Sequence, residues 1–418
     1  MTVAILGYGT AGVNAAIALR NAGYDGEIEA FVDKTFSPGE GQPAMPYSPI
    51  MTSYYAGGLK TRKECFPWDA DLLEQLRVTF VAEGPVTSLD VADKRVVTAA
   101  GSHGFEKCII CTGATPQTFG FPADCGYEPL VLRTMEDAER MKAAFEAPDC
   151  KRVLVSGASM VALKTLEAAL SLGRDVTLVG MNPHVLDFNA FPETATRFER
   201  GLESFGATLR LGMTIQDVEV ANAAEGKLRV TFSNGDVDFF DAISVAHGMK
   251  CNLDFVEKGS LDIDRALLVD DFMRTSNPDI YAAGDVAQAL ELISGERRIV
   301  GIWKTAALQG EVAGRAIAAE LAGKAPSADF AYRGAIATNT IQVRDLLFTS
   351  AGTMLQDENT ELDVTETDEM TTALLYRDIP GRGKTLVGFN IVEDASKEGD
   401  KAFDLGAMLT MRIEASFK

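Results

Sequence analysis

Three glycines near the N-terminus have the spacing of a loop that binds a dinucleotide. The segment Gly7-Tyr8-Gly9-Thr10-Ala11-Gly12 follows an apolar run from Val3 to Leu6 and precedes a helical pattern. In such a loop the first glycine permits a tight turn, the second lets the backbone approach a pyrophosphate, and the third lets helix and strand pack closely. The helix N-terminus adds free N–H groups and a positive dipole end. We therefore expect residues 7–12, Thr10 and Ala11 included, to hold a pyrophosphate.

A carboxylate follows at the place where the ribose of that dinucleotide is expected. Residues 28–32 read as the second strand, and Asp33 comes directly after it. A carboxylate at this point of a strand–helix–strand unit accepts hydrogen bonds from ribose hydroxyls. Asp33 and the adjoining Lys34 are therefore candidate contacts to the ligand.

A second signal, far downstream, favours FAD over NAD. Gly284 and Asp285 end the strand-like run 280–283. A glycine and an aspartate at a strand end can bring a carboxylate against a ribityl hydroxyl of a flavin. The helical run that follows Trp303 could aim its positive end at the flavin pyrimidine. As spacing alone, the segment could also be only a strand and a turn.

A second strand–helix–strand pattern covers residues 152–179, but its loop is less complete. It keeps Gly157 and carries Ser159 and Ala162 where the first loop has glycines. The second strand of this unit ends in Gly180-Met181, with neither an acidic residue for an NAD ribose nor an arginine for a 2′-phosphate. Small residues still permit close approach. A nicotinamide site and a scaffold that has lost its ligand therefore both stay open.

Length and composition limit what the rest of the chain can be. With 418 residues the chain can form two or three domains. The net charge of −21 argues against nucleic acid as a partner. No apolar run reaches the roughly 18 residues of a membrane span, and the N-terminus reads as a strand rather than a signal peptide. Six cysteines in this length form no disulfide framework. We expect a cytoplasmic protein without a membrane segment.

The elements between and after the motifs suggest how the domains are arranged. Residues 36–58 are rich in Pro, Gly, Tyr and Ser without a clear period, which predicts an irregular binding loop. Residues 208–247 read as strands separated by turns, and residues 306–321 form a strong helical pattern. Residues 325–329 look like a linker. Residues 330–418 have a different texture, with strand-like runs and an acidic segment, and are expected to form a smaller domain.

Taken together, these segments resemble the pyridine nucleotide-disulfide oxidoreductase family of flavoproteins. The resemblance rests on the Gly7–Gly12 loop, Asp33, residues 111–116 (Cys-Thr-Gly-Ala-Thr-Pro), the second strand–helix–strand unit and residues 280–285. It covers about residues 1–325. Within the family, the chain is most similar to NADH oxidases, coenzyme A-disulfide reductases and rubredoxin or ferredoxin reductases.

The resemblance implies a fold, a domain division and a set of contacts. The fold is α/β, with two interleaved Rossmann-like, three-layer nucleotide-binding domains and a C-terminal α+β domain. The FAD domain would comprise residues 1–118 and 250–325, the NAD(P)H domain residues 119–249, and a C-terminal domain that could mediate dimerisation residues 330–418. The expected FAD contacts are Gly7, Gly9, Thr10, Ala11, Gly12, Asp33, Lys34, Val86, Thr112, Gly113, Gly284, Asp285 and Trp303. The expected NAD(P) contacts are Gly157, Ser159, Ala162 and Gly248.

The departures from the family concern thiols. Disulfide reductases of this kind carry a cysteine pair beside the flavin, and other members use one cysteine in the stretch that here is residues 48–55, which has none. Tyr54 and Tyr55 stand near the place where relatives that serve protein acceptors often have a lysine. We therefore expect no cysteine relay. Cys108 and Cys111 lie in a strand and would point to opposite faces.

The remaining candidate residues favour structural roles. Cys65 is expected to be a packing thiol, and His247 to be structural, with a cofactor-side contact as the alternative. The three histidines have no metal-ligand spacing, and we expect no metal site.

Three functions remain open after the sequence. The first is an FAD-dependent oxidoreductase that takes hydride from NAD(P)H and passes electrons to a small molecule or an electron-carrier protein. The second is a flavin dehydrogenase or electron-transfer subunit whose nicotinamide site is vestigial. The third is a non-catalytic FAD-binding subunit of a complex.

Overall fold

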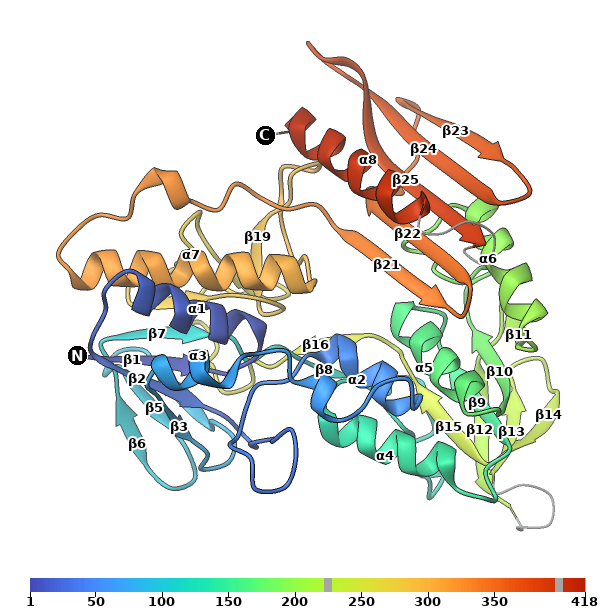
Figure 1. Cartoon of the computed structure of the whole chain (residues 1–418), viewed down its shortest axis with the longest axis horizontal. Helices are drawn as coiled ribbons and strands as arrows, with labels where there is room; N and C mark the ends of the chain where they lie inside the picture. Colours follow the sequence, from blue (N-terminus) through green and yellow to red (C-terminus); the bar gives the residue numbers. More distant parts are fainter. Residues whose placement is uncertain (222–227, 395–400, 418) are drawn as a thin grey trace.

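The computed structural model describes residues 1–221, 228–394 and 401–417, which fold into three units (Figure 1). The first α/β unit is built on a parallel sheet in the order β18-β7-β1-β2-β3. Its strands are β1 (Thr2–Leu6), β2 (Glu27–Phe31), β3 (Val78–Val81), β7 (Lys107–Ile110) and β18 (Ile280–Ala282). Its helices are α1 (Thr10–Asn21), α2 (Pro49–Ala56), α3 (Ala70–Gln75) and α7 (Trp303–Leu321), with a 3-10 turn, η1 (Lys63–Cys65).

Helices α1 and α7 pack side by side on one face of this sheet (Figure 1). A side chain at Gly310 or Gly314 of α7 would collide with the backbone of α1, at Ala11 and Ala15 respectively. Small residues at this contact therefore let the two helices approach closely. Their N-termini come together as a result. Short strands complete the unit: β4 (Ser88–Asp90), β5 (Arg95–Val97), β6 (Ser102–Gly104), β17 (Leu267–Leu268), β19 (Ala287–Leu290) and β20 (Arg297–Arg298). Strands β17 and β19 pair in parallel, and the other pairs are antiparallel.

The second α/β unit repeats the pattern with a parallel sheet in the order β11-β10-β9-β15. Its strands are β9 (Arg152–Ser156), β10 (Asp175–Gly180), β11 (Thr208–Leu211) and β15 (Ala242–Val245), with an antiparallel layer of β12 (Ile215–Val220), β13 (Leu228–Phe232) and β14 (Val237–Phe240). Its helices are α4 (Met135–Glu146), α5 (Met160–Ser171) and α6 (Pro192–Ser204). The chain enters and leaves this unit through an antiparallel pair, β8 (Ala114–Pro116) and β16 (Met249–Cys251). The second unit is thus inserted into the first, which confirms the interleaved arrangement.

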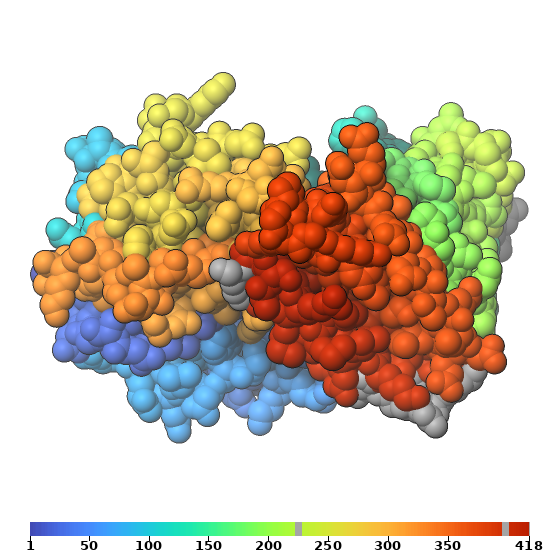
Figure 2. Space-filling view, turned by 90° about the horizontal axis from the view of Figure 1, so that it is seen from above, coloured from blue at the N-terminus to red at the C-terminus, as the bar shows by residue number. Residues whose placement is uncertain are grey.

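The C-terminal unit is an antiparallel sheet in the order β21-β22-β25-β24-β23, covered on one side by α8 (Lys401–Phe417). The strands are β21 (Thr338–Val343), β22 (Leu346–Gly352), β23 (Thr360–Glu366), β24 (Met370–Ile379) and β25 (Gly383–Asp394), after a 3-10 turn, η2 (Ala328–Phe330). Seen from above, this unit lies against both α/β units (Figure 2). Its contact with the second unit is a shared core, in which Phe348 of β22 packs on Phe198 of α6.

One expectation about local structure was wrong. Residues 49–56, predicted as part of an irregular loop, form helix α2. Ser48 has extended backbone at the N-cap and Pro49 occupies the first turn, where its fixed φ suits a helix. The buried positions are Thr52, Ser53 and Ala56, and the two hydroxyls bond back to carbonyls of the preceding turn. The buried face is therefore polar in sequence, which hides its helical period.

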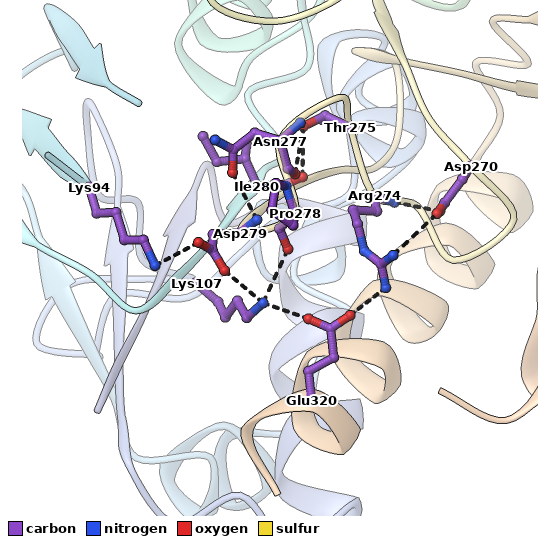
Figure 3. Close-up of polar contacts among 10 residues, drawn as sticks. All are labelled: Lys94, Lys107, Asp270, Arg274, Thr275, Asn277, Pro278, Asp279, Ile280 and Glu320. Carbon is purple, nitrogen blue, oxygen red and sulfur yellow. Dashed lines mark hydrogen bonds and ion pairs between the residues drawn. The ribbon is translucent and has the colours of Figure 1, made fainter. Parts of the chain in front are cut away.

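A network of charged side chains ties helix α7 to the first sheet at the amino ends of its strands (Figure 3). Lys107, the first residue of β7, pairs with Asp279 and with Glu320 of α7, and Arg274 pairs with the same Glu320. These residues lie at the amino ends of the strands. The carboxyl ends, where the glycine loop lies, are left for a ligand.

Candidate functional site

A cavity of about 1680 Å³ opens at the carboxyl ends of the first sheet and extends to the second α/β unit and the C-terminal unit. It is lined by nearly all of the residues that the sequence assigned to FAD, namely Gly7, Gly9, Thr10, Ala11, Asp33, Lys34, Val86, Thr112, Gly113, Gly284, Asp285 and Trp303. Gly12 lies behind the lining. Residues from the N-terminal third of the chain thus meet residues near position 300 in one site.

The three glycines of the first loop serve different purposes. Gly7 has φ +90°, and a Cβ there would lie 2.5 Å from the carbonyl oxygen of Cys111. A Cβ on Gly12 would collide with the carbonyl oxygen of Gly7. At Gly9, by contrast, a Cβ would meet no atom of the described chain within 4 Å. The protein itself does not require glycine at this position, so the open space in front of Gly9 fits a closely approaching pyrophosphate.

Two helix N-termini face this cavity without a side-chain cap. Helix α1 begins after Gly9, which has no side chain to cap it, and α7 begins after Ile302, whose side chain cannot accept a hydrogen bond. Ile302, Trp303 and Lys304 line the cavity. Each terminus therefore presents free N–H groups and the positive end of its dipole to a ligand. This arrangement suits a diphosphate at α1 and an electron-rich ring at α7.

An ion pair that the sequence did not reveal completes the middle of the cavity. Arg133 donates to a carboxylate oxygen of Asp285 over 2.7 Å, and the two side chains are 32% and 22% exposed. Arg133 is positioned by the start of α4, where Thr134 and Asp137 form a capping box and the Asp137 carboxylate also accepts from the Arg133 N–H. The capping pattern is visible in the sequence. Nothing in the sequence places it beside Asp285, because the two are 152 residues apart.

The segment at residues 112–113 is held by the chain that returns from the second unit. The Thr112 hydroxyl donates to the carbonyl oxygen of Asn252, and the Asn252 amide donates back to the Thr112 carbonyl. The Cys251 thiol donates to the carbonyl oxygen of Asp285. The crossover between the units thus fixes the floor of the cavity.

The part of the cavity that α5 and β21 line lies where all three units meet. Trp303 is stacked on Trp68, with ring centroids 6.1 Å apart. Met160, Val161 and Lys164 of α5 line this end, opposite residues 338–341 of β21. Tyr54 lies behind Lys164, and Tyr55 contacts Lys142 of α4 instead. The two tyrosines that the sequence grouped together therefore have different surroundings.

The residues predicted for NAD(P) lie outside the lining of this cavity, and the structure keeps only part of a nucleotide loop there. Gly157 has φ +117° and approaches the Ala246 carbonyl as Gly7 approaches that of Cys111. Ala162 replaces the third glycine, and Gly248 lies in the return strand region. Ser159 caps α5, its Oγ accepting from the Ala162 N–H at 3.5 Å. The N-terminus of α5 is thus partly occupied by the chain itself.

The strand register identifies what replaces Asp33 in the second unit. Leu6 pairs with Phe31 in the first sheet, and Ser156 pairs with Val179 in the second. Each of these pairs directly precedes the glycine loop, so the residue equivalent to Asp33 is Met181. Its side chain is exposed, and it offers neither a hydrogen-bond acceptor for a ribose nor a cation for a phosphate.

The remaining candidates have structural surroundings. Cys65 is buried, and burial raises the pKa of its thiol to about 11. Cys108 and Cys111 are buried as well, which raises the pKa of both thiols. His247 contacts the Ser156 hydroxyl and the Phe119 carbonyl, and burial lowers its pKa. Among the described residues no cluster of potential metal ligands occurs. No helix in the described part is long and apolar enough to cross a membrane.

Comparison with known proteins shows the family to which the chain is related. Residues 1–310 match the model of a family described as pyridine nucleotide-disulphide oxidoreductase. The chain is 28% identical to a rubredoxin-NAD(+) reductase of Pseudomonas putida over 296 residues, 71% of this chain and 74% of that protein. It is 28% identical over 328 residues to the epsilon subunit of an NADH-dependent phenylglyoxylate dehydrogenase of Aromatoleum evansii, covering 78% of this chain and 75% of that one.

Among solved structures, a NAD-dependent persulfide reductase from A. fulgidus superposes with a TM-score of 0.83 at 23% identity, covering all of this chain and 77% of that one. This likeness concerns the fold. The family match extends over most of the chain. The protein therefore belongs to the pyridine nucleotide-disulphide oxidoreductase family, whose members bind FAD and use a pyridine nucleotide.

Proposed function

We propose that this protein accepts hydride from NADH or NADPH onto FAD held in the large cavity and passes the electrons directly from reduced flavin to an acceptor. The observation that carries the proposal is the lining of one end of the cavity, where α2, α5 and β21 meet. We take this end, called the ring end below, to hold the flavin ring. Helix α2 contributes Pro49, Ile50 and Ser53 there, and no thiol. The two thiols that do line the cavity, Cys111 and Cys251, have pKa values raised by burial. Neither has the thiolate character that a redox relay needs.

The described side chains supply binding and electrostatics, and bound FAD supplies the hydride chemistry. Asp33 would accept from ribose hydroxyls, the N-terminus of α1 would hold the pyrophosphate, and Arg133 would hold the Asp285 carboxylate in place through their ion pair. Asp285 would accept from the ribityl chain. The uncapped N-terminus of α7 would stabilise negative charge that develops on the ring during reduction.

We propose a small redox protein as the acceptor. The support is the likeness to rubredoxin-NAD(+) reductase along most of both chains. Direct transfer from flavin to an iron–sulfur carrier requires no thiol intermediate, which agrees with the lining of the cavity. Oxygen or a small quinone-like molecule is the alternative acceptor within the same reaction.

We further propose that the protein is a homodimer through its C-terminal unit. Helix α8 buries one face on the sheet and exposes the apolar side chains of Phe403, Met408 and Met411 on the other, each more than half exposed. Light scattering after size exclusion tests this. A dimer that becomes monomeric on Met411→Glu is expected, and a monomer at micromolar concentration contradicts it.

Anaerobic titration tests the hydride step. Addition of NADH or NADPH to the FAD-loaded protein should bleach the yellow flavin absorbance within the mixing time of a stopped-flow instrument, and subsequent addition of an oxidised rubredoxin should restore it. Failure of both nucleotides, with bleaching by dithionite intact, would refute the use of NAD(P)H. That result would favour a second candidate function, a flavin dehydrogenase that is reduced by a metabolite or a partner protein. The loop in which Ser159 caps α5 is the observation that supports this candidate.

A further inference from the structure

A largely buried lysine lines the cavity at the point where the three units meet. Lys164 is on the face of α5 that lines the cavity, with its side chain 15% exposed. Its ammonium group donates to the Tyr54 hydroxyl at 3.0 Å, to the Glu167 carboxylate at 2.7 Å and to the Gln342 carbonyl at 2.9 Å. It also lies 4.3 Å from the centroid of the Tyr54 ring.

These contacts come from three different parts of the fold. Tyr54 belongs to α2 of the first unit, Glu167 to α5 of the second and Gln342 to β21 of the C-terminal unit. An ammonium group has three N–H donors, and here all three are used. Lys164 is therefore held as a fixed positive charge. It is not free to follow a ligand or to donate a further hydrogen bond to one.

We propose that the Lys164 ammonium, partly balanced by the Glu167 carboxylate, sets the reduction potential of the flavin bound in this cavity. The inference rests on the proposed function, since it takes the flavin ring to lie at the end of the cavity opposite Asp33. Reduction adds negative charge to the ring. A fixed cation close to a partly water-excluded ring stabilises the reduced form, and a fixed anion destabilises it.

The other cations that line the cavity are less suited to this role. Lys34 lies beside Asp33, at the opposite end, and pairs with Glu136. Arg133 is neutralised by Asp285 in the middle of the cavity. The Lys304 side chain is 80% exposed, so water screens its charge. Among the described residues of the lining, Lys164 is the cation that combines burial with a place at the ring end.

The pair predicts shifts of opposite sign for its two members. Glu167→Gln removes the anion and leaves the cation, so the potential should rise. Lys164→Met alone would leave the Glu167 carboxylate buried without its partner, which endangers folding. The double variant Lys164→Met/Glu167→Gln avoids this. The comparison between Glu167→Gln and the double variant isolates the effect of the Lys164 ammonium on the potential, because neither variant buries an unpaired carboxylate.

The measurement is the flavin midpoint potential of each FAD-loaded protein, obtained by slow anaerobic reduction with dithionite against a reference dye. We expect the equilibrium constant for two-electron reduction to be at least tenfold lower in the double variant than in Glu167→Gln, which is a fall of about 30 mV. Wild-type protein should lie between them. Lys142→Met is the matched control, because Lys142 also lies over a tyrosine ring, that of Tyr55, but outside the cavity lining.

The inference would be overturned if the equilibrium constants for reduction of Glu167→Gln and of the double variant agreed within a factor of three. Lys164 would then serve only to link the three units. An equal shift in Lys142→Met would overturn it as well. Because dithionite replaces the nucleotide, the result is independent of whether NADH or NADPH reduces the protein. Loss of nucleotide-driven reduction with the potential shifts intact would count against the proposed function alone.

Discussion

At the scale of single residues, Gly9 separates what the ligand requires from what the fold requires. A methyl group at Gly9 meets no atom of the described residues within 4 Å, and the backbone angles of Gly9 are ordinary for any residue. Gly9→Ala should therefore leave the thermal stability of the apoprotein unchanged. It should weaken FAD binding about tenfold or more, because a methyl group forced against a close-packed pyrophosphate costs about 1–3 kcal/mol.

Flavin fluorescence titration of the apoprotein checks this prediction. Gly101→Ala is the matched control, since a Cβ there also meets open space, but in a turn that does not line the cavity. Gly12→Ala should behave differently from both and lower the apoprotein stability, because its methyl group collides with the Gly7 carbonyl. Wild-type FAD affinity in Gly9→Ala would show that the pyrophosphate lies elsewhere.

Met181 carries a prediction about nucleotide preference. It occupies the place that Asp33 has in the first unit and is largely exposed. With neither carboxylate nor guanidinium at this point, wild-type protein should discriminate weakly between NADH and NADPH. Met181→Asp should raise the ratio of kcat/KM for NADH to that for NADPH about tenfold, because the carboxylate accepts from a 2′-hydroxyl and repels a 2′-phosphate. Leu355→Asp, at another exposed apolar residue that lies outside the cavity lining, is the control. An unchanged ratio in Met181→Asp would argue against nucleotide binding at this loop.

Cys65 illustrates a residue whose chemistry is decided by burial. Its thiol pKa of about 11 leaves only about one thiol in a thousand ionised at pH 8. Iodoacetamide at pH 8 should therefore leave Cys65 unmodified in the native protein and alkylate it fully in denaturant. Peptide mass spectrometry reads both states. The half-buried Cys125 should react first, and reaction of Cys65 at the same rate as Cys125 would contradict its placement in the core.

At the scale of elements, the charged network of Figure 3 ties helix α7 to the amino ends of the strands. Burial alone would raise the pKa of Glu320, but hydrogen bonds, that from Lys107 first, outweigh burial and hold the pKa below its usual value. Glu320→Gln should lower the free energy of unfolding by about 2–3 kcal/mol at pH 7, since Lys107 and Arg274 lose their shared anion. FAD affinity should not change, because the network lies at the end of the sheet away from the cavity.

The sign of the pH dependence follows from the lowered pKa. The ionised Glu320 stabilises the native state above the unfolded pKa of about 4.3, and this contribution is lost as the pH falls further. The difference between wild type and Glu320→Gln in urea denaturation should therefore keep its full size from pH 7 to about pH 5 and shrink from pH 5 to about pH 3. Glu296→Gln, in an exposed pair with Arg298, serves as the control and should cost less than about 0.5 kcal/mol. If the difference in unfolding free energy stayed constant across this pH range, the stability lost in Glu320→Gln would come from packing rather than from charge.

The sequence predicts helices and strands well where the buried positions carry apolar residues at the period of the element. Strand β1, helix α1 and strand β2 bury apolar faces, so their pattern and the glycines between them were sufficient. Helix α2 was missed because Thr52 and Ser53 occupy its buried face and satisfy their hydroxyls within the helix. Periodicity of apolar residues cannot report a helix of this kind.

At the scale of the whole molecule, the composition of the cavity could not be predicted in the same way. Lys164 is not among the contacts expected from the sequence, and Tyr54 is expected only near the place where relatives often have a lysine. Their contact, and the contact of Lys164 with Gln342, depends on how three units dock. That docking is set by long-range packing with no local sequence signal, as the pairing of Arg133 with Asp285 also shows. Local motifs thus predict where the cofactor binds, and tertiary contacts determine which side chains line the end of the cavity where the three units meet.

The docking itself leads to a last prediction, because the second α/β unit and the C-terminal unit share one core. Phe348 of β22 is fully buried with its ring 6.0 Å from that of Phe198 in α6. Phe348→Ala should cost about 3–5 kcal/mol and should raise amide hydrogen exchange in both α6 and β22. Phe389→Ala is the matched control. Phe389 is equally buried but packs with the α8 residues Leu409 and Ile413, so its loss should affect α8 and spare α6. If Phe348→Ala raised exchange in the C-terminal unit alone, the two units would be separate bodies in solution. The three-way junction that holds Lys164 would then be free to open.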